Sequence, residues 1–126
     1  MFKRIDHVEI IPRDVEATID FYTRVLNFTV RERKTVDAAP LQEVVYLELN
    51  DATVELLSVK DPAPRQTDAW PVGYRMIALE VADMDEAIAH LKTKGVELTW
   101  GPVDMGDFTR AEIKDPDGLP IELRQW

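Results

Sequence analysis

One histidine and two glutamates are the side chains of this sequence best suited to hold a metal ion or to move a proton. His7 lies in the segment 5–11, Glu55 in the segment 53–57 and Glu122 in the segment 120–124. An imidazole and two carboxylates that converge on one point can bind a divalent ion such as zinc, nickel, manganese or iron. A nearby carboxylate can also act as a general base. Two simpler roles stay open, a hydrogen-bonded core histidine for His7 and a solvated strand edge for Glu55.

The segments around these side chains have the patterns of strands and of one helix. Apolar and polar residues alternate over 5–11, which predicts a half-buried strand that carries His7. Asp14 is a favourable N-cap, and Asn27 is suited to the left-handed conformation that often ends a helix. Apolar residues return between them at helical spacing: Val15, Ile19, Tyr22 and Leu26. The further strands that we expect are 28–33, 43–49 and 52–59, with a loop over 34–42 and a turn at Asn50 and Asp51.

The second half of the chain repeats this pattern. Met76 precedes Asp83 by seven residues, just as His7 precedes Asp14. The expected elements of the second copy are strand 75–81, helix 83–94, strand 96–100 and two strands around 110–114 and 120–125. The offset between the copies falls only from 69 residues at the first strand to 67 at the last, which aligns Glu55 with Glu122. Residues 61–73 hold three prolines and show little periodicity, so they form the expected linker.

The composition excludes several kinds of protein. The chain has 126 residues, 45% of them hydrophobic, which suits one compact domain, and no stretch is long and apolar enough to cross a bilayer. It has no cysteine, so it contains no disulfide and no thiolate metal site. A net charge of -9 without a basic cluster argues against nucleic acid as a partner. The polar N-terminus lacks the apolar core of a secretory signal, so we expect a cytoplasmic protein.

The paired units and three motifs resemble the vicinal oxygen chelate superfamily. The motifs are His7-Val8-Glu9 with Asp14 seven residues after His7, Phe21-Tyr22 before Leu26-Asn27-Phe28, and Lys114-Asp115-Pro116-Asp117-Gly118 before Ile121-Glu122-Leu123. That superfamily includes glyoxalases, methylmalonyl-CoA epimerases, extradiol dioxygenases, fosfomycin-resistance enzymes and bleomycin-binding proteins. The resemblance covers essentially the whole chain. We therefore expect an α+β fold, a single domain over 1–126 whose two βαβββ modules, 1–60 and 74–126, form a curved mixed sheet with a concave site.

The resemblance also implies a set of metal ligands. In metal-dependent members the ligands come from the first and last strands of each unit, here His7, Glu55, Met76 and Glu122. Met76 departs from the pattern, because glyoxalases and epimerases usually have histidine there and a thioether is a poor ligand for hard divalent cations. The fourth position would then fall to water or to another acid. The missing second histidine also disfavours an extradiol dioxygenase or a fosfomycin-resistance enzyme.

The leading functional hypothesis is a glyoxalase-like, metal-dependent lyase or isomerase. It would act through an enediolate on a small carbonyl or thioester substrate, with the ion as Lewis acid. Glu122 or Glu55 would move the proton, and Glu9 or Glu80 are the substitutes. The expected substrate contacts are Met76, Arg110 and Trp100.

The alternative hypothesis is a metal-free protein that binds a small molecule, of the bleomycin-resistance type. An acidic groove with tryptophans would sequester a cationic drug, and both Met76 and the net charge favour this hypothesis. His7 together with Glu55 opposes it, because sequestration alone needs no imidazole and carboxylate at one point. On either hypothesis we expect a small-molecule ligand and a homodimer.

Overall fold

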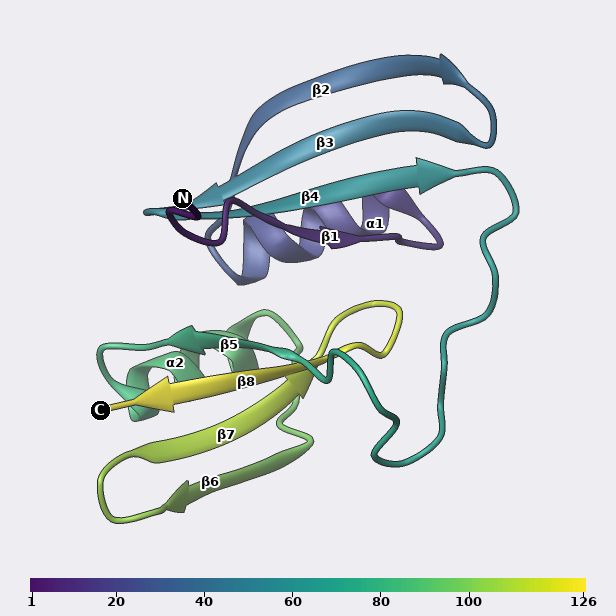
Figure 1. Cartoon of the computed structure of the whole chain (residues 1–126). Coiled ribbons are helices and arrows are strands. Elements are labelled where there is room, and N and C mark those ends of the chain that lie inside the picture. The colour runs from purple at the N-terminus through teal and green to yellow at the C-terminus, as the bar shows by residue number, and fades with distance from the viewer. The chain divides into compact units, whose positions relative to one another are not determined.

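The chain folds into two units, each with one mixed sheet and one helical segment (Figure 1). The computed structural model describes residues 1–126 and divides them into unit 1, Met1–Pro64, and unit 2, Arg65–Trp126. The two four-stranded mixed sheets and short helices confirm the expected α+β fold. The predicted linker 61–73 contains no helix or strand, and the division between the units falls within it. The module boundaries stay a prediction.

Unit 1 has the predicted order of strand, helix and three strands. Its elements are β1 Val8–Ile10, α1 Val15–Asp20, the π-helical turn η1 Phe21–Val25, β2 Thr29–Ala38, β3 Leu41–Leu49 and β4 Ala52–Val59. The strands lie in the order β1-β4-β3-β2, with β1 parallel to β4 and the other pairs antiparallel. The Asp14 side chain accepts a hydrogen bond from the Ala17 N–H at 3.1 Å, which caps α1 as predicted. Asn27 follows the helix with a φ of 64°, also as expected.

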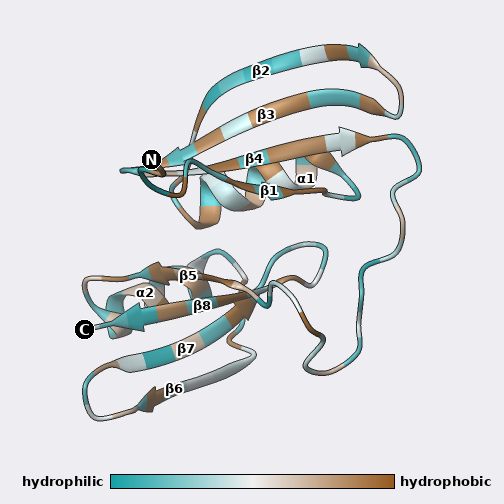
Figure 2. Ribbon diagram, viewed as in Figure 1, coloured by the Kyte–Doolittle hydropathy of each residue, from teal (hydrophilic) through white to brown (hydrophobic).

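The two faces of the unit 1 sheet differ in chemistry. Alternate residues of the central strands β3 and β4 are buried, namely Val45, Leu47, Val54 and Leu56, and α1 packs against β4. Figure 2 shows these central strands largely in apolar colours, whereas the edge strand β2 is mostly hydrophilic. Because strand side chains alternate between faces, Glu55 lies on the face opposite α1. One face of the sheet therefore makes the core. The opposite face, which carries Glu55, is called the open face below.

Unit 2 repeats this arrangement. Its elements are β5 Ile77–Glu80, α2 Met84–Thr93, β6 Trp100–Asp104, β7 Thr109–Lys114 and β8 Pro120–Gln125. The order β5-β8-β7-β6, with β5 parallel to β8, matches that of unit 1. The Asp83 side chain accepts a hydrogen bond from the Glu86 N–H at 2.9 Å, and Gly95 follows α2 with a φ of 72°.

No helix of either unit has the length and apolar character that a membrane span requires.

The loop predicted over 34–42 is wrong. β2 continues to Ala38 and β3 begins at Leu41, so that only Ala39 and Pro40 connect them. Polar residues and Pro40 resemble a loop in sequence, but β2 is an exposed edge strand, and its polar side chains face solvent while its backbone pairs with β3. His7 likewise lies immediately before the short strand β1 rather than inside it.

The strand predicted over 96–100 is also misplaced, because β6 begins at Trp100, where the predicted strand ended. Gly101 and Pro102 would ordinarily mark a turn. Here they form an irregularity in the β6–β7 register between Trp100 and Val103. Gly101 has a φ of 77°, and a Cβ there would lie 2.7 Å from the Arg110 carbonyl oxygen. The glycine thus permits a close approach of two backbones within the sheet.

Candidate functional site

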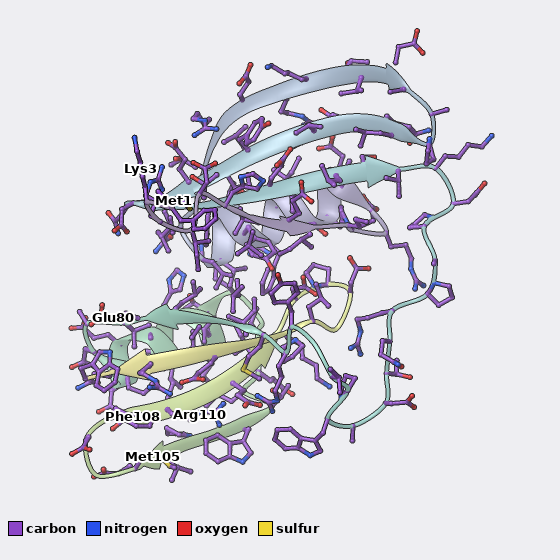
Figure 3. The ribbon with its side chains drawn as sticks, viewed as in Figure 1. Met1, Lys3, Glu80, Met105, Phe108 and Arg110 are labelled. Carbon is purple, nitrogen blue, oxygen red and sulfur yellow. The ribbon has the colours of Figure 1, made fainter.

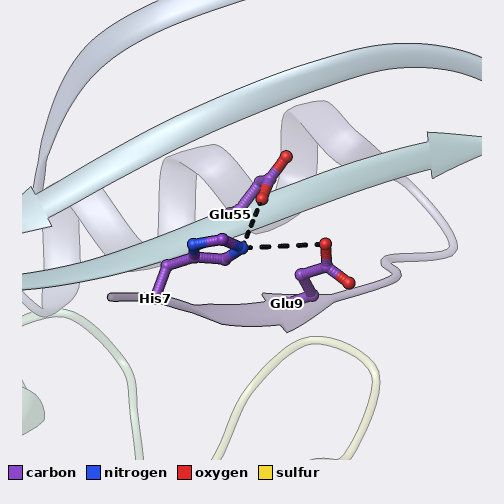
Figure 4. Close-up of side chains that lie close together, drawn as sticks. All are labelled: His7, Glu9 and Glu55. Carbon is purple, nitrogen blue, oxygen red and sulfur yellow. Dashed lines mark ion pairs between the residues drawn. The ribbon is translucent and has the colours of Figure 1, made fainter. Parts of the chain in front are cut away.

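His7, Glu9 and Glu55 come together on the open face of the unit 1 sheet (Figure 4). The parallel pairing of β1 with β4 places Glu9 opposite Glu55, and His7 lies two residues before Glu9 on the same face. The His7 Nε2 atom lies 2.9 Å from a Glu55 carboxylate oxygen and 3.7 Å from a Glu9 oxygen. One ligand atom from each of the three residues lies within 4.8 Å of the others.

Asp6 fixes the orientation of the imidazole. Its carboxylate lies 2.9 Å from the His7 Nδ1 atom, so this nitrogen donates to Asp6. In the neutral ring the Nε2 atom then carries the lone pair and faces the two glutamates. Carboxylates that hold the outer ring nitrogen in this way are common supports of histidine metal ligands. The sequence-based interpretation missed Asp6, although its position next to His7 was the available signal.

The electrostatics of the cluster favour a positive charge at its centre. The hydrogen bond to Asp6 raises the pKa of His7, partial burial opposes the shift, and the Glu55 carboxylate adds to it. The Glu55 charge also raises the pKa of Tyr46, which lies opposite it on β3. The Glu55 side chain is only 9% exposed, whereas that of Glu9 is 55% exposed. A buried carboxylate, an exposed one and an oriented imidazole form a donor set that fits a divalent ion of borderline softness.

The positions of unit 2 that correspond to Glu9 and Glu55 have different residues or contacts. Ala78 pairs with Glu122 as Glu9 pairs with Glu55, so the counterpart of Glu9 has no ligand atom. Glu122 is buried, and one of its oxygens accepts a hydrogen bond from Arg124 Nε at 2.7 Å while the other accepts one from Arg110 Nη2 at 3.3 Å. Burial acts to raise the pKa of Glu122, but the hydrogen bonds from both arginines outweigh it, and the pKa is lowered. Glu122 belongs to unit 2, so its predicted place beside His7 and Glu55 stays a prediction.

The three predicted substrate contacts lie along one run of neighbours in unit 2. The Arg110 Nη2 atom lies 3.9 Å from the Met76 sulfur, and its guanidinium carbon lies 4.9 Å from the centre of the Trp100 ring. The structure therefore brings Met76, Arg110 and Trp100 together, although their role toward a substrate stays a prediction. Glu80 is exposed and pairs in register with Arg124. The sequence-based interpretation missed Arg124 and Glu112, which the two-residue spacing from Glu122 and Arg110 could have found.

Known proteins resemble this chain along nearly its whole length. The family model of the Glyoxalase/Bleomycin resistance protein/Dioxygenase superfamily matches residues 4–123. The uncharacterized protein YwkD of Bacillus subtilis is 34% identical over 98% of this chain and 97% of its own length. A lactoylglutathione lyase of Neisseria meningitidis is 33% identical over 97% of this chain and 90% of its own. The crystal structure of a glyoxalase family protein from Enterococcus faecalis has a TM-score of 0.83 and 29% identity, with 98% of both chains covered. This chain belongs to the Glyoxalase/Bleomycin resistance protein/Dioxygenase superfamily.

Proposed function

We propose that this protein is a metal-dependent lyase or isomerase of the glyoxalase type, acting on a small carbonyl or thioester substrate. The observation that carries the proposal is the cluster of His7, Glu9 and Glu55, whose ligand atoms lie within 4.8 Å of one another. The similarity to a lactoylglutathione lyase at 33% identity supports the same class of reaction. Glutathione conjugates, acyl-CoA thioesters and small hydroxyketones are the substrates to screen.

The residues of unit 1 would hold the metal. His7 would contribute its Nε2 atom, while Glu55 and Glu9 would each contribute a carboxylate oxygen. Nickel, zinc, manganese and iron all suit a mixed imidazole and carboxylate set. A bound divalent ion supplies a Lewis acid that stabilises negative charge developing on a substrate oxygen. Glu122 was also expected as a ligand, and in that role it would have to exchange its contacts with Arg110 and Arg124 for the ion.

The different burial of the two glutamates suggests a division of roles. Glu55 is buried and 2.9 Å from the imidazole, so it is suited to be a fixed ligand. Glu9 is more exposed and its oxygen lies further from the imidazole, at 3.7 Å, so it would be the weaker ligand, free to leave the metal and take a proton from a carbon next to a carbonyl. Glu9 is therefore our preferred general base. Glu55 and Glu122 were the first choices from the sequence, and the lowered pKa of Glu122 makes it a weaker proton acceptor.

Exchange of the substrate proton with deuterated solvent tests this function directly. The metal-loaded protein should catalyse exchange at the carbon next to a carbonyl, measured by NMR on each substrate class. Glu9→Gln should reduce the exchange rate by about 100-fold, the usual contribution of a general base. Glu97→Gln removes an exposed acid that lies outside the helices and strands and serves as the control, with unchanged exchange expected. Equal rates in the wild type and Glu9→Gln would contradict the role of Glu9, and no exchange with any substrate class would contradict the proposed reaction.

A metal-free binding protein is the second candidate. Two observations favour it, the methionine at position 76 and the engagement of Glu122 by two arginines. Saturable quenching of tryptophan fluorescence by a cationic glycopeptide, without turnover, would support this function. The homodimer and the cytoplasmic location expected from the sequence stay predictions.

A further inference from the structure

A row of five side chains with alternating charge crosses the open face of the unit 2 sheet, the face opposite α2. It runs from Arg124 through Glu122, Arg110 and Glu112 to Arg75. The neighbouring charged groups lie 2.7, 3.3, 2.6 and 3.9 Å apart in that order. The row begins and ends on arginine, so it carries one positive charge more than its carboxylates neutralise. Glu80 lies in register with Arg124 at the end of this row, so the acids there match the arginines but do not outnumber them, although the whole chain has a net charge of -9.

The arginines of this row are held in place by aromatic rings. Arg110 lies over Trp100 at 4.9 Å, Arg75 over Trp70 at 4.4 Å and Arg124 over Phe108 at 3.9 Å, measured from the guanidinium carbon to the ring centre. Figure 3 labels Arg110 on β7 and Phe108 just before that strand. A stacked guanidinium loses little further freedom when it binds an oxyanion, because its plane is already fixed.

The two arginines that contact Glu122 retain donors for a ligand. The carboxylate contacts of Arg110 all use its Nη2 atom, and those of Arg124 use Nε and Nη2. A guanidinium has five N–H donors, so Nη1 of each residue and Nε of Arg110 are left to bind another acceptor. The two side chains are 18% and 28% exposed, which leaves them accessible while limiting competition from water.

Comparison of the two copies shows that only unit 2 has arginines beside its buried glutamate. The strand registers align Arg110 with Val44 and Arg124 with Leu57, while Glu122 aligns with Glu55. Unit 1 therefore has two apolar residues where unit 2 has two arginines. A row of ion pairs is not needed to build this sheet, because the other copy of the same sheet does without it.

We propose that the open face of unit 2 is an anion-binding site, in which Arg110 and Arg124 bind a carboxylate or phosphate group of a small molecule. Glu122 acts as a positioning residue that holds the two guanidinium groups side by side. The proposal goes beyond the metal chemistry of unit 1 and does not depend on it, so it is tested on metal-free protein. It also gives Glu122 a role that metal ligation would exclude.

The test follows the arginine Nε–H signals of the chelator-treated, ¹⁵N-labelled full chain by NMR. Inorganic phosphate and malonate are the two probes, titrated separately so that a preference separates phosphate from carboxylate ligands. Arg110→Lys and Arg124→Lys identify the two signals and keep the charge. Arg31 is the matched internal control, because it too is stacked on an aromatic ring, Tyr46, and paired with a carboxylate, Glu48.

We expect saturable shifts of the Arg110 and Arg124 signals, with the Arg31 signal unchanged. Each lysine variant should weaken binding about tenfold, since lysine loses the planar fork of donors. The two arginines use separate oxygens of Glu122, and Glu122→Gln leaves only one acceptor oxygen, so one guanidinium loses its partner and binding should weaken about fivefold. Thermal unfolding confirms that each variant is folded. Shifts of equal size at Arg31, no saturable shift with either probe, or unchanged or stronger binding in folded Glu122→Gln would overturn the proposal.

Discussion

At the scale of single residues, the ring orientation set by Asp6 is the feature that most affects metal binding. The raised pKa of His7 means that protons compete with the metal for Nε2. The protonated form stabilises the metal-free fold below the ordinary histidine pKa of about 6.5, and this contribution is lost as the pH rises through the raised pKa. Metal binding has the opposite dependence, and its affinity should fall as the pH drops through that raised pKa.

Asp6→Asn tests this competition. Loss of the Asp6 charge should lower the pKa of His7, so the fall in metal affinity should move to lower pH. Metal titrations at several values between about pH 5.5 and 8 measure the midpoint in both proteins. The substitution also weakens the orientation of the ring, so the affinity at high pH should fall by about tenfold. An unchanged midpoint would show that Asp6 does not control the protonation of His7.

The hydroxyl group of Thr18 is a buried polar group that the fold leaves without a hydrogen bond. Thr18 is fully buried in α1, and its hydroxyl has no hydrogen-bond partner. Thr18→Val keeps the shape and removes the unsatisfied group, so it should raise the free energy of unfolding by about 1 kcal/mol. Thr23→Val is the matched control, because the Thr23 hydroxyl donates to the Ile19 carbonyl at 2.7 Å and its loss should destabilise. Denaturant unfolding measures both, and a loss of stability in Thr18→Val would contradict the account.

At the scale of elements, β6 depends on Gly101. Its positive φ and the backbone contact at 2.7 Å mean that Gly101→Ala should cost about 2 kcal/mol or more in unfolding free energy. Gly95→Ala is the control, since Gly95 has a φ of 72° but no atom within 4 Å of the position that a Cβ would take, and it should cost only about 1 kcal/mol. Denaturant unfolding distinguishes the two costs. Equal values would show that the close approach to Arg110 is not a tight constraint.

Periodicity predicted the helices and central strands well because those elements bury one face. Asp14 and Asp83 at the helix starts and Asn27 after the first helix are local signals, and each is used as expected. Periodicity did not predict the edge strands β2 and β6 correctly, because these strands bury little. β2 buries little, so its residues carry no apolar alternation, and β6 contains a glycine and a proline that usually mark a turn. Both segments are strands because their backbones pair with β3 and β7, and such pairing leaves no local pattern in the sequence.

At the scale of the whole molecule, the duplication is the main architectural feature, and the two copies have diverged in charge. Unit 1 has His7, Glu9 and Glu55 on its open face, whereas unit 2 has Met76, Ala78 and Glu122 at the same positions. The sequence predicted the duplication and the pairing of His7 with Glu55. The contact of Glu122 with Arg124 lies within β8 and could have been expected from their two-residue spacing, whereas its contact with Arg110 joins two neighbouring strands, which no local pattern records.

The central claim is that unit 1 forms a metal centre around His7, and metal content is its most direct measure. Elemental analysis would compare the wild type with His7→Ala after purification without chelator and after dialysis against nickel, zinc, manganese or iron. His90→Ala removes the other histidine of the chain, on α2, and is the matched control. We predict near-stoichiometric metal in the wild type and in His90→Ala, and its loss in a folded His7→Ala. Full occupancy in His7→Ala, or no metal in the wild type under any loading, would contradict the account.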